Sequence, residues 1–218
     1  MRQVFQQELA EVQERLVHIA EAVYQSIQDA TRAFNESNVA LAESVIANDE
    51  EIDSATGRLD ELAIDILARQ APVARDLRIV VTALRISASL ERMGDIAVHI
   101  AQLSRYRFPD KVAPQSLVST FQRMGALDVE ISRMLVELIK TQDPKIAEQI
   151  RNEDDKVDEL HLGVFETVLG ETWNGAAVDT VDSTLASRYH ERFADHAVSV
   201  AKKMQYLVTG DWVGAGQA

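Results

Sequence analysis

Apolar residues recur every three or four positions along almost the whole chain, a spacing that places them on one face of an α-helix. No stretch alternates apolar and polar side chains as a half-buried strand does. Cap-forming residues at 36–38 interrupt the first apolar stripe, and Pro72 ends the second, because proline is costly inside a helix. The first half of the chain therefore predicts three helices. Their stripes consist of Phe5, Leu9, Val12, Leu16, Ile19, Val23, Ile27, Ala30 and Phe34, then Leu41, Val45, Ile52, Ala55, Leu59, Leu62 and Ile66, then Ile79, Ala83, Ile86, Leu90, Met93, Ala97 and Ile100.

The second half repeats this plan after a linker at residues 107–114, RFPDKVAP. Asp143 and Pro144 have the form of a helix cap followed by proline at the first helical position. The segment 170–177, GETWNGAA, predicts the last turn, and Gly210 ends the last helix. The pattern is typical of an all-α protein with six long antiparallel helices, arranged as two tandem pseudo-symmetric three-helix bundles at residues 1–108 and 109–218. The stripes of the fourth and sixth helices consist of Leu117, Phe121, Met124, Ile131, Leu135 and Leu138, and of Tyr189, Phe193, Ala197, Val200, Met204 and Leu207.

The amino-acid composition of the chain argues against several classes of function. Of the 218 residues, 46% are hydrophobic and 26% charged, which is typical of a globular protein. The chain has no cysteine, which excludes disulfides and thiolate metal sites. The net charge of −13 argues against nucleic acid as a partner. No apolar run approaches the roughly 18–20 residues of a membrane span, and the charged start does not resemble a secretory signal, so we expect a cytoplasmic protein.

One phrase occurs twice. ERMGDIAVHIA runs over residues 91–101 and ERFADHAVSVA over residues 191–201, an offset of 100. Glu91 and Asp95 are one helical turn apart and therefore share a face, as do Glu191 and Asp195. With acids at 35 of 218 positions, about five or six such pairs arise by chance, so the spacing alone is a weak signal. The positions of the pairs within the fold carry more information.

The second predicted helix carries its own acidic pair, Asp49 and Asp53. The midpoints of the two pairs in the first half, 51 and 93, average to 72, the position of Pro72 in the turn between the helices. Residues equidistant from the turn of an antiparallel hairpin lie at the same height. The sequence therefore predicts that Asp49, Asp53, Glu91 and Asp95 face one another across one groove.

The second half repeats the arrangement with Asp154, Asp158, Glu191 and Asp195. The midpoints are 156 and 193, and their mean of 174.5 falls on the predicted turn at residues 174–175. The first pair is displaced by 105 residues between the halves and the second by 100. The second hairpin is thus five residues shorter, yet its pairs still meet.

Four convergent carboxylates without basic partners need a cation, because each raises the pKa of its neighbours. Arg92 directly follows Glu91 and is expected on another face. Oxygen ligands alone favour hard ions such as Mg²⁺, Mn²⁺, Ca²⁺ or ferric iron. His99 shares the face of Glu91, and His190 and His196 flank the second phrase, so each is a possible ligand. For all three the commoner role is packing or surface exposure.

The segments 70–101 and 188–210 resemble the PhoU family of phosphate-transport accessory proteins, and the resemblance covers essentially the whole chain. It implies two symmetric three-helix bundles with metal ions at acidic E/D-x-x-x-D motifs. The resemblance implies iron or zinc among the bound metals, and the oxygen ligands also suit manganese or magnesium, so the identity of the metal stays open. By this resemblance the ligands are Asp49, Asp53, Glu91, Asp95, Asp154, Asp158, Glu191 and Asp195.

The resemblance further implies a homodimeric negative regulator of the phosphate-starvation response. Such a protein links the ATPase subunit of the phosphate ABC transporter to a sensor histidine kinase, reaches the membrane only through partners, and has no catalytic activity. Two positions depart from the family pattern. Ile96 stands where a histidine is common, and His99 where asparagine is usual, so the two metal sites are expected to differ.

Two other functions remain open. Helical bundles with paired carboxylates also include di-metal carboxylate enzymes, but those use Glu-x-x-His, and no glutamate here has a histidine three residues later. A metal-free helical adaptor, whose acids form only a solvated face, is the other alternative. Removal of metal would leave such an adaptor unchanged.

Overall fold

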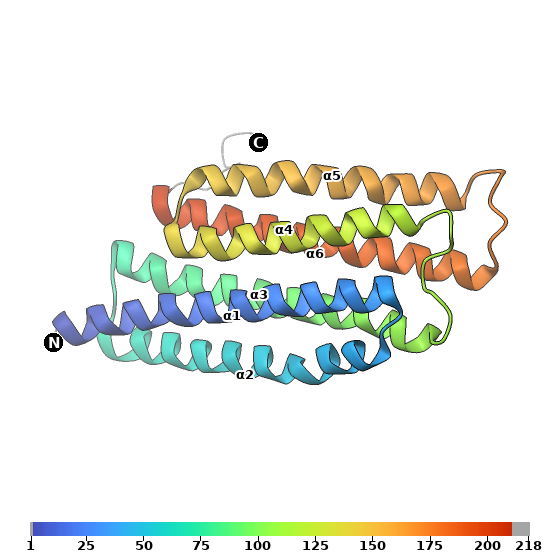
Figure 1. Ribbon diagram of the computed structural model, residues 1–218. Helices are drawn as coiled ribbons and strands as arrows, with labels where there is room; N and C mark the ends of the chain where they lie inside the picture. Colours follow the sequence, from blue (N-terminus) through green and yellow to red (C-terminus); the bar gives the residue numbers. More distant parts are fainter. Residues whose placement is uncertain (1, 211–218) are drawn as a thin grey trace.

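The computed structural model describes residues 2–210, which form helices joined by short connections (Figure 1). Within that range there is no strand, and no helix is long and apolar enough to cross a membrane. The prediction of an all-α protein with six long helices is confirmed. The helices are α1 (Arg2–Glu36), α2 (Val39–Gln70), α3 (Ala74–Arg107), α4 (Val118–Thr141), α5 (Pro144–Val168) and α6 (Ala177–Thr209).

Local side-chain chemistry sets several helix boundaries. The side chain of Asn38 accepts a hydrogen bond from the Leu41 amide at 3.1 Å and caps α2. Asp143 accepts from the Lys145 amide at 2.9 Å, and Pro144 occupies the first turn of α5. Helix α6 ends at Gly210, whose φ of +82° is a left-handed conformation that glycine adopts without strain. These capping and terminating residues can be recognised from the sequence alone.

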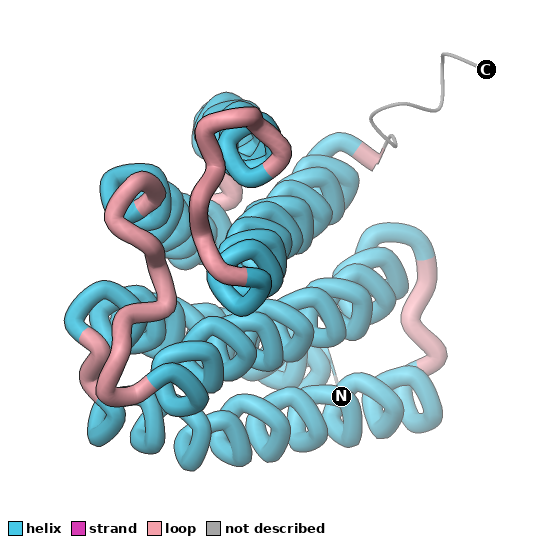
Figure 2. The backbone as a smooth tube through the Cα atoms, turned by 90° about the vertical axis from the view of Figure 1, so that its right-hand side faces the viewer, coloured by secondary structure: helices cyan, strands magenta, loops and turns pink. Residues whose placement is uncertain are grey.

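The helices form two groups of three that stack on each other (Figures 1 and 2). Within each group every helix packs against the other two, as short connections between long antiparallel helices require. Between the groups α3 packs against α6, and α1 packs against α4. The predicted pseudo-symmetric pair of three-helix bundles is therefore confirmed.

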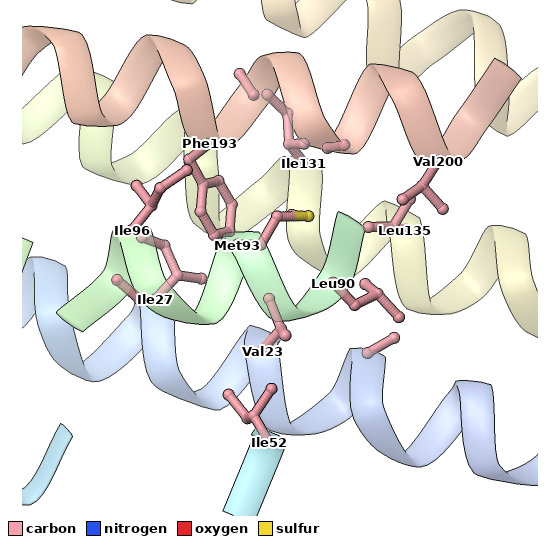
Figure 3. Close-up of a cluster of buried hydrophobic side chains, with 14 of the residues drawn as sticks. Val23, Ile27, Ile52, Leu90, Met93, Ile96, Ile131, Leu135, Phe193 and Val200 are labelled. Carbon is pink, nitrogen blue, oxygen red and sulfur yellow. The ribbon is translucent and has the colours of Figure 1, made fainter. Parts of the chain in front are cut away.

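Apolar side chains fill both groups and the interface between them. Every residue of the predicted stripes is buried or half-buried. Met93 and Ile96 of α3 lie near Phe193 of α6 at this interface (Figure 3). Full burial of one such side chain contributes about 1.5–3 kcal/mol, so the repeated stripes account for the fold's main driving force.

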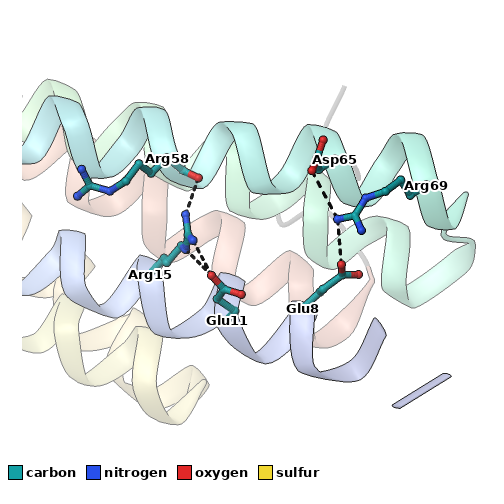
Figure 4. Close-up of polar contacts among 6 residues, drawn as sticks. All are labelled: Glu8, Glu11, Arg15, Arg58, Asp65 and Arg69. Carbon is teal, nitrogen blue, oxygen red and sulfur yellow. Dashed lines mark hydrogen bonds and ion pairs between the residues drawn. The ribbon is translucent and has the colours of Figure 1, made fainter. Parts of the chain in front are cut away.

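Polar contacts on the outer surface join α1 to α2 (Figure 4). The Arg15 guanidinium donates to the backbone carbonyl of Arg58 at 2.6 Å. Arg69 forms an ion pair with Glu8 at 2.9 Å. Such solvated pairs contribute at most about 1 kcal/mol each, so they orient the helices more than they stabilise them.

Candidate metal centres

Helices α2 and α3 meet closely at the first group of predicted ligands. A Cβ added to Gly94 of α3 would lie 3.2 Å from Oδ1 of Asp49 and 3.1 Å from the Ile52 side chain of α2. The absence of a side chain at Gly94 therefore lets α3 approach the carboxylate of Asp49. This close approach places the acids of α2 beside Glu91 and Asp95.

The four acids of this first group lie within electrostatic reach of one another. Burial, followed by the nearby carboxylates of Asp53, Asp95 and Glu91 in that order, raises the pKa of Asp49 to about 6. Oδ1 of Asp49 is buried and has no hydrogen-bond donor. A buried oxygen of this kind is costly unless a donor or a cation satisfies it.

The second group, from α5 and α6, repeats these features. Burial is the largest cause that raises the pKa of Asp154 to about 7, and the carboxylates of Asp158, Asp195, Asp155 and Glu191 contribute the rest, in that order. Oδ1 of Asp154 and Oε2 of Glu191 are buried without a hydrogen-bond partner. Burial also raises the pKa of Asp158 and of Glu191.

The two groups match atom for atom at their most buried member. Asp154 is offset from Asp49 by 105, the offset of the acidic pairs in the sequence. In each half Oδ1 of this aspartate is buried without a hydrogen-bond partner, and the pKa of its carboxyl is raised. The same buried oxygen without a partner and the same raised pKa therefore recur in both halves.

Each group also contains an arginine, contrary to the sequence-based expectation. Nη1 of Arg92 lies 2.8 Å from Oδ2 of Asp95, and Arg188 forms an ion pair with Glu191. The expectation that Arg92 points to another face is wrong, because a side chain three residues before an acid shares its face. The arginines neutralise one carboxylate in each group and leave Asp49 and Asp154 unpaired.

Among the side chains of residues 3–210, no three histidine or acidic groups already converge closely enough to hold one ion. A shared coordination shell would therefore require rotation about side-chain bonds of the more exposed acids. The donor set itself fits a hard cation, since it consists of carboxylate oxygens and includes buried oxygens without donors. The ligand role of all eight acids remains a prediction.

Two of the three histidines that the sequence offers as ligands have partners outside the acidic groups. His99 stacks on Tyr189, with ring centroids 5.2 Å apart. His190 is buried in the second half and pairs with Asp128 of α4, a residue that the sequence analysis did not single out. His196 is half-buried, and burial followed by the charge of Arg192 lowers its pKa. His196 lies in the electrostatic field of a predicted ligand, Asp195.

Comparisons with known proteins show what the whole chain resembles. The PhoU domain matches residues 16–104 and again residues 121–204. The phosphate-specific transport system accessory protein PhoU homolog 2 of Mycobacterium tuberculosis is 39% identical over 210 residues, covering 96% of this chain and 99% of that protein. The crystal structure of PhoU from Pseudomonas aeruginosa superposes with a TM-score of 0.83 at 25% identity, covering 95% of this chain and 100% of the other. The phosphate transport system regulatory protein PhoU from Streptococcus pneumoniae shares the fold, with a TM-score of 0.86 at 22% identity, 96% coverage of this chain and 99% of the other.

Proposed function

Because this chain belongs to the PhoU family, we propose that it is an accessory protein of phosphate-specific transport that represses phosphate uptake and the phosphate-starvation response. The similarity to a relative of that name along nearly the whole of both chains carries the proposal. The proposed partners are the ATPase subunit of the phosphate ABC transporter and a sensor histidine kinase. The protein acts as a cytoplasmic homodimer without catalytic activity and meets the membrane only through these partners.

The proposed role includes metal binding. Asp49, Asp53, Glu91 and Asp95 would hold cations in the first half, and the equivalent acids of α5 and α6 in the second. The buried Oδ1 atoms of Asp49 and Asp154, which have no donor, support this assignment. A bound cation would supply positive charge that offsets the mutual repulsion of the carboxylates.

A metal-free adaptor is a second candidate, and one observation favours it. The ion pairs of Arg92 with Asp95 and of Arg188 with Glu191 already supply one positive charge to each acidic group. In that case the acids act as a charged docking surface, and chelators leave binding and regulation unchanged. Under the metal-dependent proposal, chelators weaken both.

Deletion of the gene tests the regulatory role. A reporter fused to a starvation-induced promoter is measured in phosphate-rich medium, in a strain that carries no second copy of the family. The proposal predicts that repression is lost on deletion and restored by the parent gene. Repression that persists without the gene would overturn it. Complementation with Glu91→Ala/Glu191→Ala then separates a metal-dependent regulator from one that requires only the fold.

A further inference from the structure

His161 of α5 is not among the candidate ligands considered above, yet it lies one turn beyond the second acidic group. It follows Asp158 by three residues, so the two side chains share a face of α5. Of the five histidines in the chain, it is the only one with an acid three residues earlier. Di-metal carboxylate proteins place a carboxylate and a histidine at this same spacing, with glutamate in the position of the aspartate.

Contacts with two neighbouring side chains fix the ring of His161. Its Nδ1 lies 2.8 Å from Oγ of Ser187, which is one turn before Glu191 on α6. The ring also meets that of Phe165 edge-on, with centroids 5.0 Å apart. Among the described residues, Ser187 is the only hydrogen-bond partner of the imidazole, so Nε2 has none.

The hydroxyl of Ser187 determines which ring nitrogen carries the proton. Oγ of Ser187 donates its own hydrogen to the backbone carbonyl of Thr184 at 3.4 Å, so it accepts a hydrogen bond from Nδ1 of His161. A neutral histidine protonated at Nδ1 keeps the lone pair of Nε2 free. Metal-binding histidines almost always donate their other ring nitrogen in this way, which fixes the orientation of the ring.

The charges around His161 place it beside the acids of the second group. Burial and then the charge of Asp195 raise the pKa of Asp158, whereas the charge of His161 lowers it. Burial, followed by the charge of Arg188, lowers the pKa of His161 and favours the neutral ring that a metal requires. Arg188, which pairs with Glu191, therefore lies within electrostatic reach of both His161 and Asp158.

The first half has no imidazole at the equivalent position. At the offset of 105, His161 corresponds to Thr56, because 161 − 105 = 56. Thr56 is buried, and its hydroxyl donates to the backbone carbonyl of Asp53 at 2.8 Å. The first acidic group therefore offers only oxygen ligands at this height, whereas the second has a nitrogen within reach.

We propose that Nε2 of His161 binds the same cation as Asp158 and Glu191, and thereby gives the second half a mixed nitrogen and oxygen site. Asp158 is exposed, so rotation of its side chain can bring the carboxylate to the ion. The ion replaces the positive charge of Arg188 beside Glu191. Imidazole suits zinc and iron, whereas carboxylates alone suit manganese and magnesium. The second half therefore prefers Zn²⁺ or Fe²⁺ more strongly than the first half does. The inference deepens the proposed metal binding and rests on it.

Calorimetric titration with Zn²⁺ and with Mn²⁺ tests the role of His161. The full-length chain carries Asp53→Ala/Asp95→Ala, so that only the second group retains all its acids. In this background His161→Gln should weaken Zn²⁺ binding by about tenfold or more and Mn²⁺ binding by less than about threefold, because nitrogen matters more to zinc. His161→Glu replaces the nitrogen with an oxygen ligand, so it should retain Mn²⁺ binding and lose the preference for Zn²⁺.

His99→Gln is the matched control, because His99 is exposed and stacks on Tyr189 outside the second group. It should leave the affinity for both ions unchanged, and circular dichroism verifies that every variant folds. In ¹⁵N NMR spectra of the imidazole rings, Zn²⁺ should shift the Nε2 resonance that is missing in His161→Gln.

Three results would overturn the inference. They are an unchanged Zn²⁺ affinity in His161→Gln, equal losses of Zn²⁺ and Mn²⁺ affinity in that variant, and an Nε2 resonance that Zn²⁺ does not move. Equal losses would identify His161 as a residue that only supports the fold. Each of these results leaves metal binding by the acids intact, whereas a parent protein that binds neither ion rejects the metal-dependent proposal together with the inference.

Discussion

Nδ1 of His190 lies 2.6 Å from Oδ2 of Asp128, and both side chains are essentially inaccessible to solvent. Oδ1 of Asp128 and Nε2 of His190 have no hydrogen-bond partner. The offsets of 105 and 100 relate this pair to Val23 and Leu90, because 128 − 105 = 23 and 190 − 100 = 90. One half of the protein thus has an apolar core pair where the other has a polar one.

This difference predicts the outcome of a double substitution. Asp128→Val/His190→Leu reproduces the pair of the first half and should change the free energy of unfolding little or raise it, because a buried polar pair is often replaceable by apolar residues. Asp128→Val alone leaves a buried histidine without its partner and should cost about 3 kcal/mol or more. Urea denaturation measures both. If the double variant loses as much free energy of unfolding as the two single variants together, the apolar pair does not substitute for the polar one and the explanation is wrong.

Asp128 should also make stability depend on pH. Burial raises the pKa of Asp128 to about 6, against the opposing effect of His190, whereas the pKa of an aspartate in an unfolded chain is about 3.9. Between these two pH values the folded protein binds the proton more tightly than the unfolded chain does. The protonated carboxyl therefore adds to the free energy of unfolding below about pH 4, and this stabilisation is lost as the pH rises through about 6. Asp128→Asn should flatten the fall in unfolding free energy over that interval, measured with chelator in both samples. Parallel profiles for parent and variant would exclude this contribution.

Metal binding should stabilise the folded state. A cation that binds only the folded protein adds about 3 kcal/mol per site at a free concentration one hundred times its Kd. Chelator should therefore lower the melting temperature, and added Mn²⁺ should restore it. Glu91→Gln removes one carboxylate from the first group and should reduce the response. A melting temperature that responds to neither reagent would support the metal-free adaptor.

The arginines of the acidic groups should compete with metal. Arg92→Gln frees Asp95, and Arg188→Gln frees Glu191, so each variant should bind Mn²⁺ several-fold more tightly in calorimetric titrations. Arg133→Gln is a suitable control, because Arg133 pairs with Glu130 at the same i, i+3 spacing outside both groups, at 2.6 Å. If all three variants bind Mn²⁺ with the same affinity, the ion pairs of Arg92 and Arg188 do not oppose metal binding.

Much of the fold follows from short-range patterns in the sequence. The apolar period, the caps at Asn38 and Asp143, and the stop at Gly210 depend on neighbouring residues, and they predicted all six helices. The hairpin symmetry about Pro72 also predicted which acids would lie together. These features depend on backbone geometry, which periodicity specifies well.

The remaining features depend on side-chain rotation and on contacts between distant helices. The pairing of Arg92 with Asp95 requires a particular rotamer, which spacing does not determine. The pair of Asp128 and His190 joins α4 to α6. The sequence contains only one indication of this pair. Asp128 lies between Met124 and Ile131 in an otherwise apolar stripe, and a lone acid in such a stripe needs a buried partner.

The metal content of the protein tests the central claim most directly. The protein is purified without chelator or polyhistidine tag, and inductively coupled plasma mass spectrometry compares the parent with two variants, Asp53→Ala/Asp95→Ala and Asp158→Ala/Asp195→Ala. If each half binds metal through its own acids, each variant should lose the metal of one half and retain that of the other. Equal metal content in the parent and both variants, or no metal in the parent even after incubation with Mn²⁺ or iron, would contradict the account.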